Sequence, residues 1–175
     1  MPYRKVIFAQ NQFYHVFNRS IGSEQVFSRK DCLKRALDLF NFYRFPQQIS
    51  FSDLHKLNLE IREMRLKQIY SSPPLVEIVS FALMSDHYHL LLRQLEGDGI
   101  KNFISNFQNS YARYYNTKFN RHGSVFTNMF KAVHVSSNEQ LIHLARYIHL
   151  NPVTSYVIEI ETLERYPYTS FSTYM

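Results

Sequence analysis

The sequence is poor in the features that mark secreted and membrane proteins. Its 175 residues include one cysteine, Cys32, so no disulfide can form within the chain. Cys32 falls in the apolar register of an expected helix, which indicates a core residue. No apolar run approaches the roughly 18 residues of a membrane span, and the start MPYRKVIFAQNQ lacks a signal peptide's apolar core and cleavage site. We therefore expect a cytoplasmic protein without membrane segments.

Apolar and basic residues are abundant instead. Hydrophobic residues make up 45% of the chain and aromatic residues 16%, which excludes a disordered chain. The length is typical of one domain, and neither an internal repeat nor a low-complexity segment divides it. The net charge of +6 favours polyanionic partners such as nucleic acid, although charge alone does not establish such a partner.

Four stretches rich in β-branched and aromatic residues predict strands. The first is Phe13–Arg19. Val76–Met84 and His87–Arg93 are separated only by Ser85 and Asp86, which predicts a tight hairpin of central strands. The last expected strand is Lys131–Val135.

Two helices are expected between the first strand and the hairpin. One opens at Ser28, with Asp31 as the acidic member of a capping box. The other places an apolar stripe on one face before Pro73 ends it. The stripe comprises Leu54, Leu57, Ile61 and Met64.

Two further helices flank the last strand. The first is capped by Asp98 and reaches Tyr115. The second begins at Ser137 with a capping box and stops at Pro152. This order predicts an α+β fold, an antiparallel sheet with helices packed on one side. We treat residues 46–74 as a helical insertion within a single domain spanning residues 1–175.

A histidine pair on the hairpin is a candidate metal site. Because side chains alternate along a strand, His87 and His89 emerge on the same face, with Cα atoms about 7 Å apart. Such a pair can bind one divalent metal ion if a third ligand arrives from elsewhere. An H-x-H pair on a strand can also be solvated or purely structural.

The last helix offers partners for this pair. Tyr147 and Asn151 lie within about 40° of each other around the helix, at the border of its buried stripe. His149 points about 160° away from Tyr147, so we exclude it as a co-ligand. Asn151 precedes Pro152 and is expected at the helix end, with its amide turned inward or acting as a C-terminal cap. A phenol is a poor nucleophile at neutral pH, but a nearby cation favours its phenolate form.

Several motifs together resemble one known family. They occur in order between residues 13 and 171: YHVFNR, FALMSDHYHLLL, SYARYYN, GSVFTNMFK, RYIHLNPV and YPYTSF. This set is similar to the tyrosine (HUH-type) transposases of the short single-strand insertion sequences, especially their repeat-associated relatives. The resemblance covers nearly the whole chain and is far more specific than the histidine pair alone.

The resemblance implies a fold, a chemistry and a set of site residues. The fold would be a ferredoxin-like sheet, with Tyr147 as the nucleophile and with His87, His89 and Asn151 as ligands of Mg²⁺ or Mn²⁺. The enzyme would cleave and rejoin single-stranded DNA that bears hairpins or palindromic repeats, through a 5′-phosphotyrosine intermediate. A homodimer is also suggested. Ser85 and Asp86 depart from the usual Pro-Asn, and Asp86 adds negative charge beside the presumed phosphate site.

Basic and aromatic residues supply candidate DNA contacts. Side chains that could neutralise phosphates are Arg19, Arg113, Lys118, Arg121 and Lys131. Unpaired bases could stack on Tyr114, Tyr115 and Phe126. Taken singly, each basic residue is more often a solvated surface charge, and core packing is the more common role of each aromatic residue.

Two other functions fit the same residues. The first is a catalytically silent protein that binds hairpin DNA. The second is a metal-dependent hydrolase that activates water, in which Tyr147 would be dispensable. A covalent protein–DNA intermediate separates these readings from the transposase, because neither of them forms one.

Overall fold

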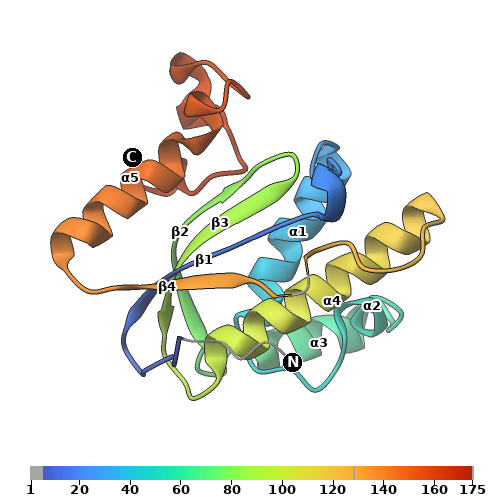
Figure 1. Ribbon diagram of the computed structural model, residues 1–175. Helices are drawn as coiled ribbons and strands as arrows, with labels where there is room; N and C mark the ends of the chain where they lie inside the picture. Colours follow the sequence, from blue (N-terminus) through green and yellow to red (C-terminus); the bar gives the residue numbers. More distant parts are fainter. Residues whose placement is uncertain (1–5, 128, 175) are drawn as a thin grey trace.

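The protein is built on a four-stranded antiparallel sheet, seen in a computed structural model that describes residues 6–127 and 129–174 (Figure 1). The strands are β1 (Phe13–Arg19), β2 (Val76–Leu83), β3 (His87–Gln94) and β4 (Lys131–Val135). Their order across the sheet is β2-β3-β1-β4, and every neighbouring pair is antiparallel. The predicted α+β class and antiparallel sheet are confirmed.

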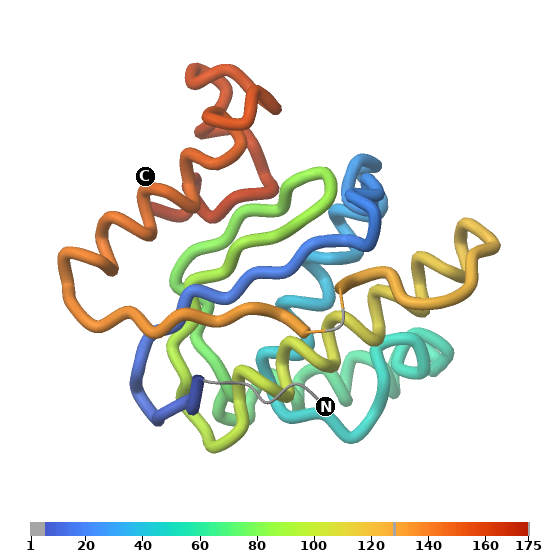
Figure 2. The backbone as a smooth tube through the Cα atoms, in the orientation of Figure 1, coloured from blue at the N-terminus to red at the C-terminus, as the bar shows by residue number. Residues whose placement is uncertain are grey.

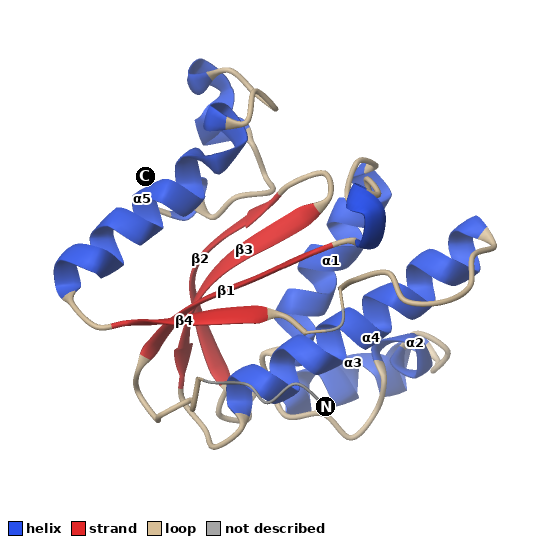
Figure 3. Ribbon diagram, viewed as in Figure 1, coloured by secondary structure: helices blue, strands red, loops and turns tan. Residues whose placement is uncertain are grey.

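Helices lie on both faces of this sheet (Figure 3). The long helices α1 (Lys30–Tyr43) and α4 (Gly99–Phe119) pack against one face, with the short α2 (Phe51–Leu54) and α3 (Leu59–Tyr70) beside them. Helix α5 (Asn138–Thr154) crosses the opposite face. The prediction of helices on one side therefore holds for α1 to α4, and α5 forms a separate layer.

Strand alternation explains why the two faces differ. Tyr14 and Val16 of β1, with Leu90 and Leu92 of β3, are buried against α1 and α4 in the main core. Residues of the opposite register face α5 in a smaller apolar cluster that includes Ala82, Leu91, Val135 and Ile148. The face toward α5 thus has the smaller apolar cluster and also carries polar side chains such as His87 and His89.

Strand positions follow the sequence prediction closely. The observed bounds of β1 and β4 are the predicted ones, and Ser85 and Asp86 form the hairpin turn between β2 and β3. Cys32 is buried in the core, as expected. Within the described residues, no helix has the length and apolarity needed to cross a bilayer.

The start of α1 corrects the expected capping box. The helix begins at Lys30, and its first turn receives no side-chain cap from Arg29. The Ser28 hydroxyl donates to the Gln25 carbonyl instead. The Asp31 carboxylate pairs with Arg29 and Lys118. The Asp31 carboxylate, which would act in a capping box, forms these ion pairs instead.

The insertion also differs from the expected single helix. The chain forms α2 and then breaks, and α3 starts after Asn58, whose side-chain oxygen accepts from the Ile61 amide. Leu54 is buried in α2, but Met64 is 61% exposed, so the predicted stripe is not one buried face. A local Asn cap was a stronger signal than the spacing of apolar residues.

Helix α5 starts as predicted but ends later. The Ser137 hydroxyl accepts from the Gln140 amide, which confirms the N-terminal cap. The helix then continues through Pro152 to Thr154, so the prediction that Pro152 ends it is wrong. Asn151 is consequently inside the helix rather than at its end. The Pro152 carbonyl still has partners, because it accepts from the Val157 and Ile158 amides.

The C-terminal segment returns to the sheet beside β2 (Figure 2). The Leu83 amide donates to the Tyr168 carbonyl, and the Ser170 amide donates to the Phe81 carbonyl. The Ser170 hydroxyl accepts from the Phe81 amide and is hydrogen-bonded to His149 Nε2 of α5, both at 2.9 Å. This segment therefore ties α5 to the edge of the sheet.

Candidate active site

The candidate site begins with a row of side chains across the sheet. Strand pairing aligns Ala82 of β2, His89 of β3, Phe17 of β1 and Lys131 of β4. Directly opposite residues of paired strands project on the same face, so all four face α5. The next row toward the hairpin turn pairs His87 with Arg19. The sheet itself therefore brings both predicted histidines and two predicted basic residues to one surface.

Hydrogen bonds occupy the same nitrogen of both histidines. His87 Nδ1 lies 2.5 Å from Asp86 Oδ1, and His89 Nδ1 lies 2.9 Å from His15 Nε2. The two imidazole centroids are 5.2 Å apart. Within the described part of the chain, Nε2 is thus the nitrogen that each ring leaves available. In metal-binding histidines, one ring nitrogen usually forms a hydrogen bond within the protein and the other binds the metal. Nδ1 and Nε2 are divided in this way here.

Burial keeps the inner histidines neutral. Desolvation lowers the pKa of His89 from 6.5 to about 3, with smaller contributions from the positive charges of His15, His87 and Arg19. Desolvation alone lowers the pKa of His15 to about 4. A neutral imidazole is the form that can bind a metal ion.

Tyr147 stands over this histidine pair from α5. Its ring centroid lies 5.6 Å from that of His89 and 6.4 Å from that of His15, in edge-to-face arrangements. The side chain remains 50% exposed. The phenol is therefore beside the histidines of its own chain and is also accessible to a large substrate.

Asn151 lies one turn after Tyr147 on α5. Its side chain is buried, and its amide nitrogen Nδ2 has no hydrogen-bond partner among the described residues. An uncommitted buried amide is costly unless a ligand satisfies it, so this amide is compatible with a role in binding. No group of three or more His, Cys, Asp and Glu in residues 6–127 and 129–174 could hold a metal ion. The two imidazoles and the amide oxygen of Asn151 are nitrogen and oxygen donors of the kinds that bind divalent cations.

His149 takes no part in this group. It bonds to Ser170 on the other side of α5 and contacts the Phe171 ring, with centroids 5.7 Å apart. The helical spacing correctly separated it from Tyr147.

The predicted DNA-contacting residues divide between the two faces. Arg19 and Lys131 lie beside the histidines, and Lys131 Nζ is 6.0 Å from the Phe17 ring centroid. Arg113, Lys118 and Arg121 belong to α4 or its C-terminal end, on the opposite face. Lys118 pairs with Asp31, and Arg121 Nη2 lies 2.9 Å from Glu24 Oε2. The structure thus brings two of the five basic residues to the site.

The aromatic residues proposed for base stacking lie elsewhere. Phe126 and Tyr115 are buried in the main core, which makes them packing residues and corrects the stacking prediction for both. Tyr114 is partly exposed, but its ring carries the Arg35 guanidinium at 4.5 Å. Core packing, the alternative noted for each of these residues, accounts for Phe126 and Tyr115.

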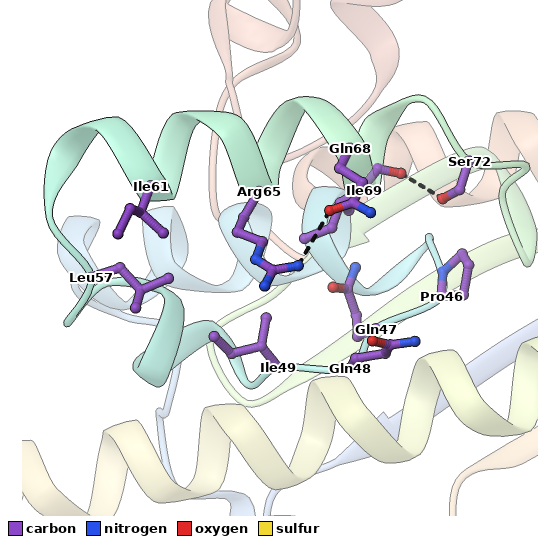
Figure 4. Close-up of a pocket in the computed structure, with 10 residues that line it drawn as sticks. All are labelled: Pro46, Gln47, Gln48, Ile49, Leu57, Ile61, Arg65, Gln68, Ile69 and Ser72. Carbon is purple, nitrogen blue, oxygen red and sulfur yellow. Dashed lines mark hydrogen bonds between the residues drawn. The ribbon is translucent and has the colours of Figure 1, made fainter.

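A separate cavity of about 560 Å³ lies in the insertion (Figure 4). It is lined by α3 residues such as Arg65 and Gln68, and by the loop that contains Gln47 and Ile49. None of the histidines, Tyr147 or Asn151 lines it. This cavity and the candidate chemistry are therefore in different places.

Sequence reasoning missed His15. Its signal was present in the strand alternation, because His15 and Phe17 share the face opposite the buried Tyr14 and Val16. The pairing of β1 with β3, which sequence spacing does not reveal, places it diagonal to His89.

Comparison with known proteins identifies the family. Residues 55–151, more than half of the chain, match the family of IS200-like transposases. The chain belongs to this family. The match includes both histidines and Tyr147 and ends at Asn151. No curated protein matches the sequence. The family resemblance found from the motifs is thus confirmed.

Solved structures support the fold of this IS200-like transposase. A REP-associated tyrosine transposase bound to a REP hairpin matches with a TM-score of 0.62 at 12% identity, over 99% of this chain and 84% of that one. A Deinococcus radiodurans transposase structure has a TM-score of 0.42 at 17% identity, over 85% and 95% of the respective chains. The REP-associated transposase shares the fold of this chain. The similarity to the Deinococcus radiodurans structure is too low to support a conclusion.

Proposed function

We propose that this IS200-like transposase cleaves and rejoins single-stranded DNA that bears hairpins, with Tyr147 as its nucleophile. The observation that carries the proposal is the position of Tyr147, half exposed and 5.6 Å from the His89 ring. A residue that only packed α5 against the sheet would bury its side chain, as Ile148 does. The exposed phenol is instead open to a backbone as large as that of DNA.

His87, His89 and Asn151 would hold a divalent cation. Mg²⁺ or Mn²⁺ bound there would polarise the scissile phosphate and stabilise the charge that develops on its oxygens. The protein contributes the buried His89 imidazole, whose pKa is lowered by desolvation, the side-chain amide of Asn151, whose oxygen could bind the cation, and a strand that carries both histidines. These properties support the metal site without a third histidine.

The reaction is a transesterification at phosphorus. The Tyr147 oxygen attacks the phosphate in line, the bond from phosphorus to the 3′-oxygen breaks, and that oxygen leaves as a 3′-hydroxyl after gaining a proton. The 5′-phosphate stays on the tyrosine, so the energy of the phosphodiester is conserved. Attack by another 3′-hydroxyl reverses the step and joins two strands, which is why no nucleotide cofactor is required.

Hairpin DNA is the proposed substrate for two reasons. The structural relative with the same architecture was solved with a REP hairpin. In addition, Arg19 and Lys131 flank the histidines and could neutralise the phosphates on either side of the scissile bond. Arg113, Lys118 and Arg121 remain candidate contacts for a duplex stem on the other face.

A covalent adduct tests this function. The protein would be incubated with Mn²⁺ and labelled single-stranded DNA that carries a hairpin, and then resolved on a denaturing gel. We expect a labelled protein band in the wild type and in Tyr156→Phe, which removes a tyrosine that is 96% exposed and outside the site. Tyr147→Phe should abolish the band. An adduct that persists in Tyr147→Phe would falsify the assignment of the nucleophile.

The same assay separates the alternatives. Cleaved DNA without an adduct, unaffected by Tyr147→Phe, would indicate a hydrolase that activates water. Retarded but uncut hairpins in the presence of Mn²⁺ would indicate a silent binding protein.

A further inference from the structure

The hairpin turn carries an acidic side chain directed at a candidate ligand. Asp86 Oδ1 accepts a hydrogen bond from His87 Nδ1 at 2.5 Å. Its side chain is only 17% exposed, and that of His87 is 21% exposed. A carboxylate on Nδ1 fixes which ring nitrogen carries the proton and which one is left as a lone-pair donor.

The fold does not need the Asp86 side chain to form this turn. Backbone hydrogen bonds hold the turn, because the Met84 amide donates to the His87 carbonyl. The Asp86 carbonyl accepts from the Ser20 amide, and the Ser85 carbonyl accepts from the Phe27 amide. The carboxylate is therefore available for a task other than shaping the hairpin.

The second carboxylate oxygen faces a cation. Arg19 Nε lies 3.5 Å from Asp86 Oδ2, and Arg19 is the residue paired with His87 across the sheet. Arg19, Asp86 and His87 thus form a chain of contacts from β1 to the edge of the site. The sequence suggested that Asp86 adds unbalanced negative charge beside the phosphate, but Arg19 balances this charge locally.

From this geometry we infer that Asp86 is a positioning residue for His87. It holds the imidazole as the Nδ1–H tautomer, with Nε2 directed outward as the metal-binding atom. The inference rests on the proposed function for the identity of the ligand, but its tautomer can be measured without any metal. Removing the partner of a metal-binding histidine typically weakens metal affinity by about 10-fold to 100-fold.

Three variants isolate this role. Asp86→Ala removes the acceptor. Asp86→Asn keeps an amide oxygen that can accept from Nδ1 but removes the charge. Asp98→Ala is the matched control, because Asp98 is also an acidic residue at a turn, with a side chain that is 66% exposed and lies 3.5 Å from Lys101 Nζ. Thermal melting of each variant would establish that it is folded.

The first measurement is the tautomer of His87 by ¹⁵N NMR in metal-free protein, with the signal assigned by its loss in His87→Gln. We expect the Nδ1–H tautomer in the wild type, Asp86→Asn and Asp98→Ala, and a shift toward Nε2–H in Asp86→Ala. A wild-type His87 protonated on Nε2, or an Asp86→Ala spectrum identical to wild type, would overturn the inference.

The second measurement is Mn²⁺ affinity by calorimetry. Asp86→Ala should bind about 10-fold to 100-fold more weakly, Asp86→Asn should lie between it and the wild type, and Asp98→Ala should be unchanged. Equal affinity of all variants would overturn the inference, and complete loss in Asp86→Asn would show a direct ligand instead. A wild type with the expected tautomer that binds no Mn²⁺ would refute the metal centre of the proposed function alone.

Discussion

Acid should destabilise the protein through its buried histidines. Burial lowers the pKa of His15 from 6.5 to about 4 and that of His89 to about 3. The unfolded chain therefore binds protons in a pH range where the native state does not. Stability is complete above the unfolded value of 6.5 and falls as the pH decreases from 6.5 toward these folded values.

The shift of His15 sets the magnitude. At about pH 5, a histidine whose pKa falls from 6.5 to about 4 on folding costs about 2 kcal/mol of unfolding free energy relative to neutral pH. His89 shares a hydrogen bond with His15, so the two contributions are coupled and cannot be added. Carboxylates act at lower pH, because the pKa values of Asp53 and Glu139 are lowered from 3.8 and 4.5.

Urea unfolding followed by circular dichroism between about pH 7 and pH 5 would measure this loss. His15→Gln retains a hydrogen-bonding group and cannot titrate, so its stability should depend less on pH by about 2 kcal/mol over this interval. His134→Gln is the control, because it removes an exposed histidine of β4 and should keep the wild-type slope. Equal slopes in the wild type and His15→Gln would refute the argument that burial holds His15 neutral.

Three further predictions concern the scaffold, each measured by urea unfolding at neutral pH. Gly99→Ala should destabilise by about 1–3 kcal/mol, because its Cβ would lie 2.3 Å from the Leu75 carbonyl oxygen. Gly97→Ala, with nothing within 4 Å, should stay within about 0.5 kcal/mol, and equal stability of the two variants would contradict the close approach. Ser170→Ala should cost about 1–3 kcal/mol by removing the partner of two hydrogen bonds, and no loss would mean that they contribute nothing. Leu90→Ala should cost about 2–5 kcal/mol at a fully buried site, and a smaller loss would indicate a core that collapses around the gap.

The strands could be predicted from sequence because their signals are local. Alternation and turn residues fixed β1, β4 and the hairpin at Ser85 and Asp86. The same alternation placed His87 and His89 on one face, and helical spacing placed Tyr147 apart from His149. These inferences needed only the period of each element.

Three of the misses involve contacts with residues outside the element concerned. Asp31 was read as a capping residue, but its partner Lys118 comes from α4. Pro152 was expected to end α5, but the chain beyond it folds back and donates to its carbonyl. His15 joined the site through the pairing of β1 with β3. Sequence spacing within one element cannot report any of these contacts.

The C-terminal segment that lies along β2 protects an edge of the sheet, which its loss would expose. Its backbone occupies part of an outer strand that would otherwise present unpaired donors and acceptors, the groups that promote association between sheets. Proteolytic trimming before Tyr168 would uncover that strand and remove the contact of Ser170 with α5, although every candidate site residue would remain in the chain. A trimmed preparation could therefore aggregate and lose measurable activity, and mass spectrometry of the C-terminus would distinguish this failure from one caused by a substitution at the site.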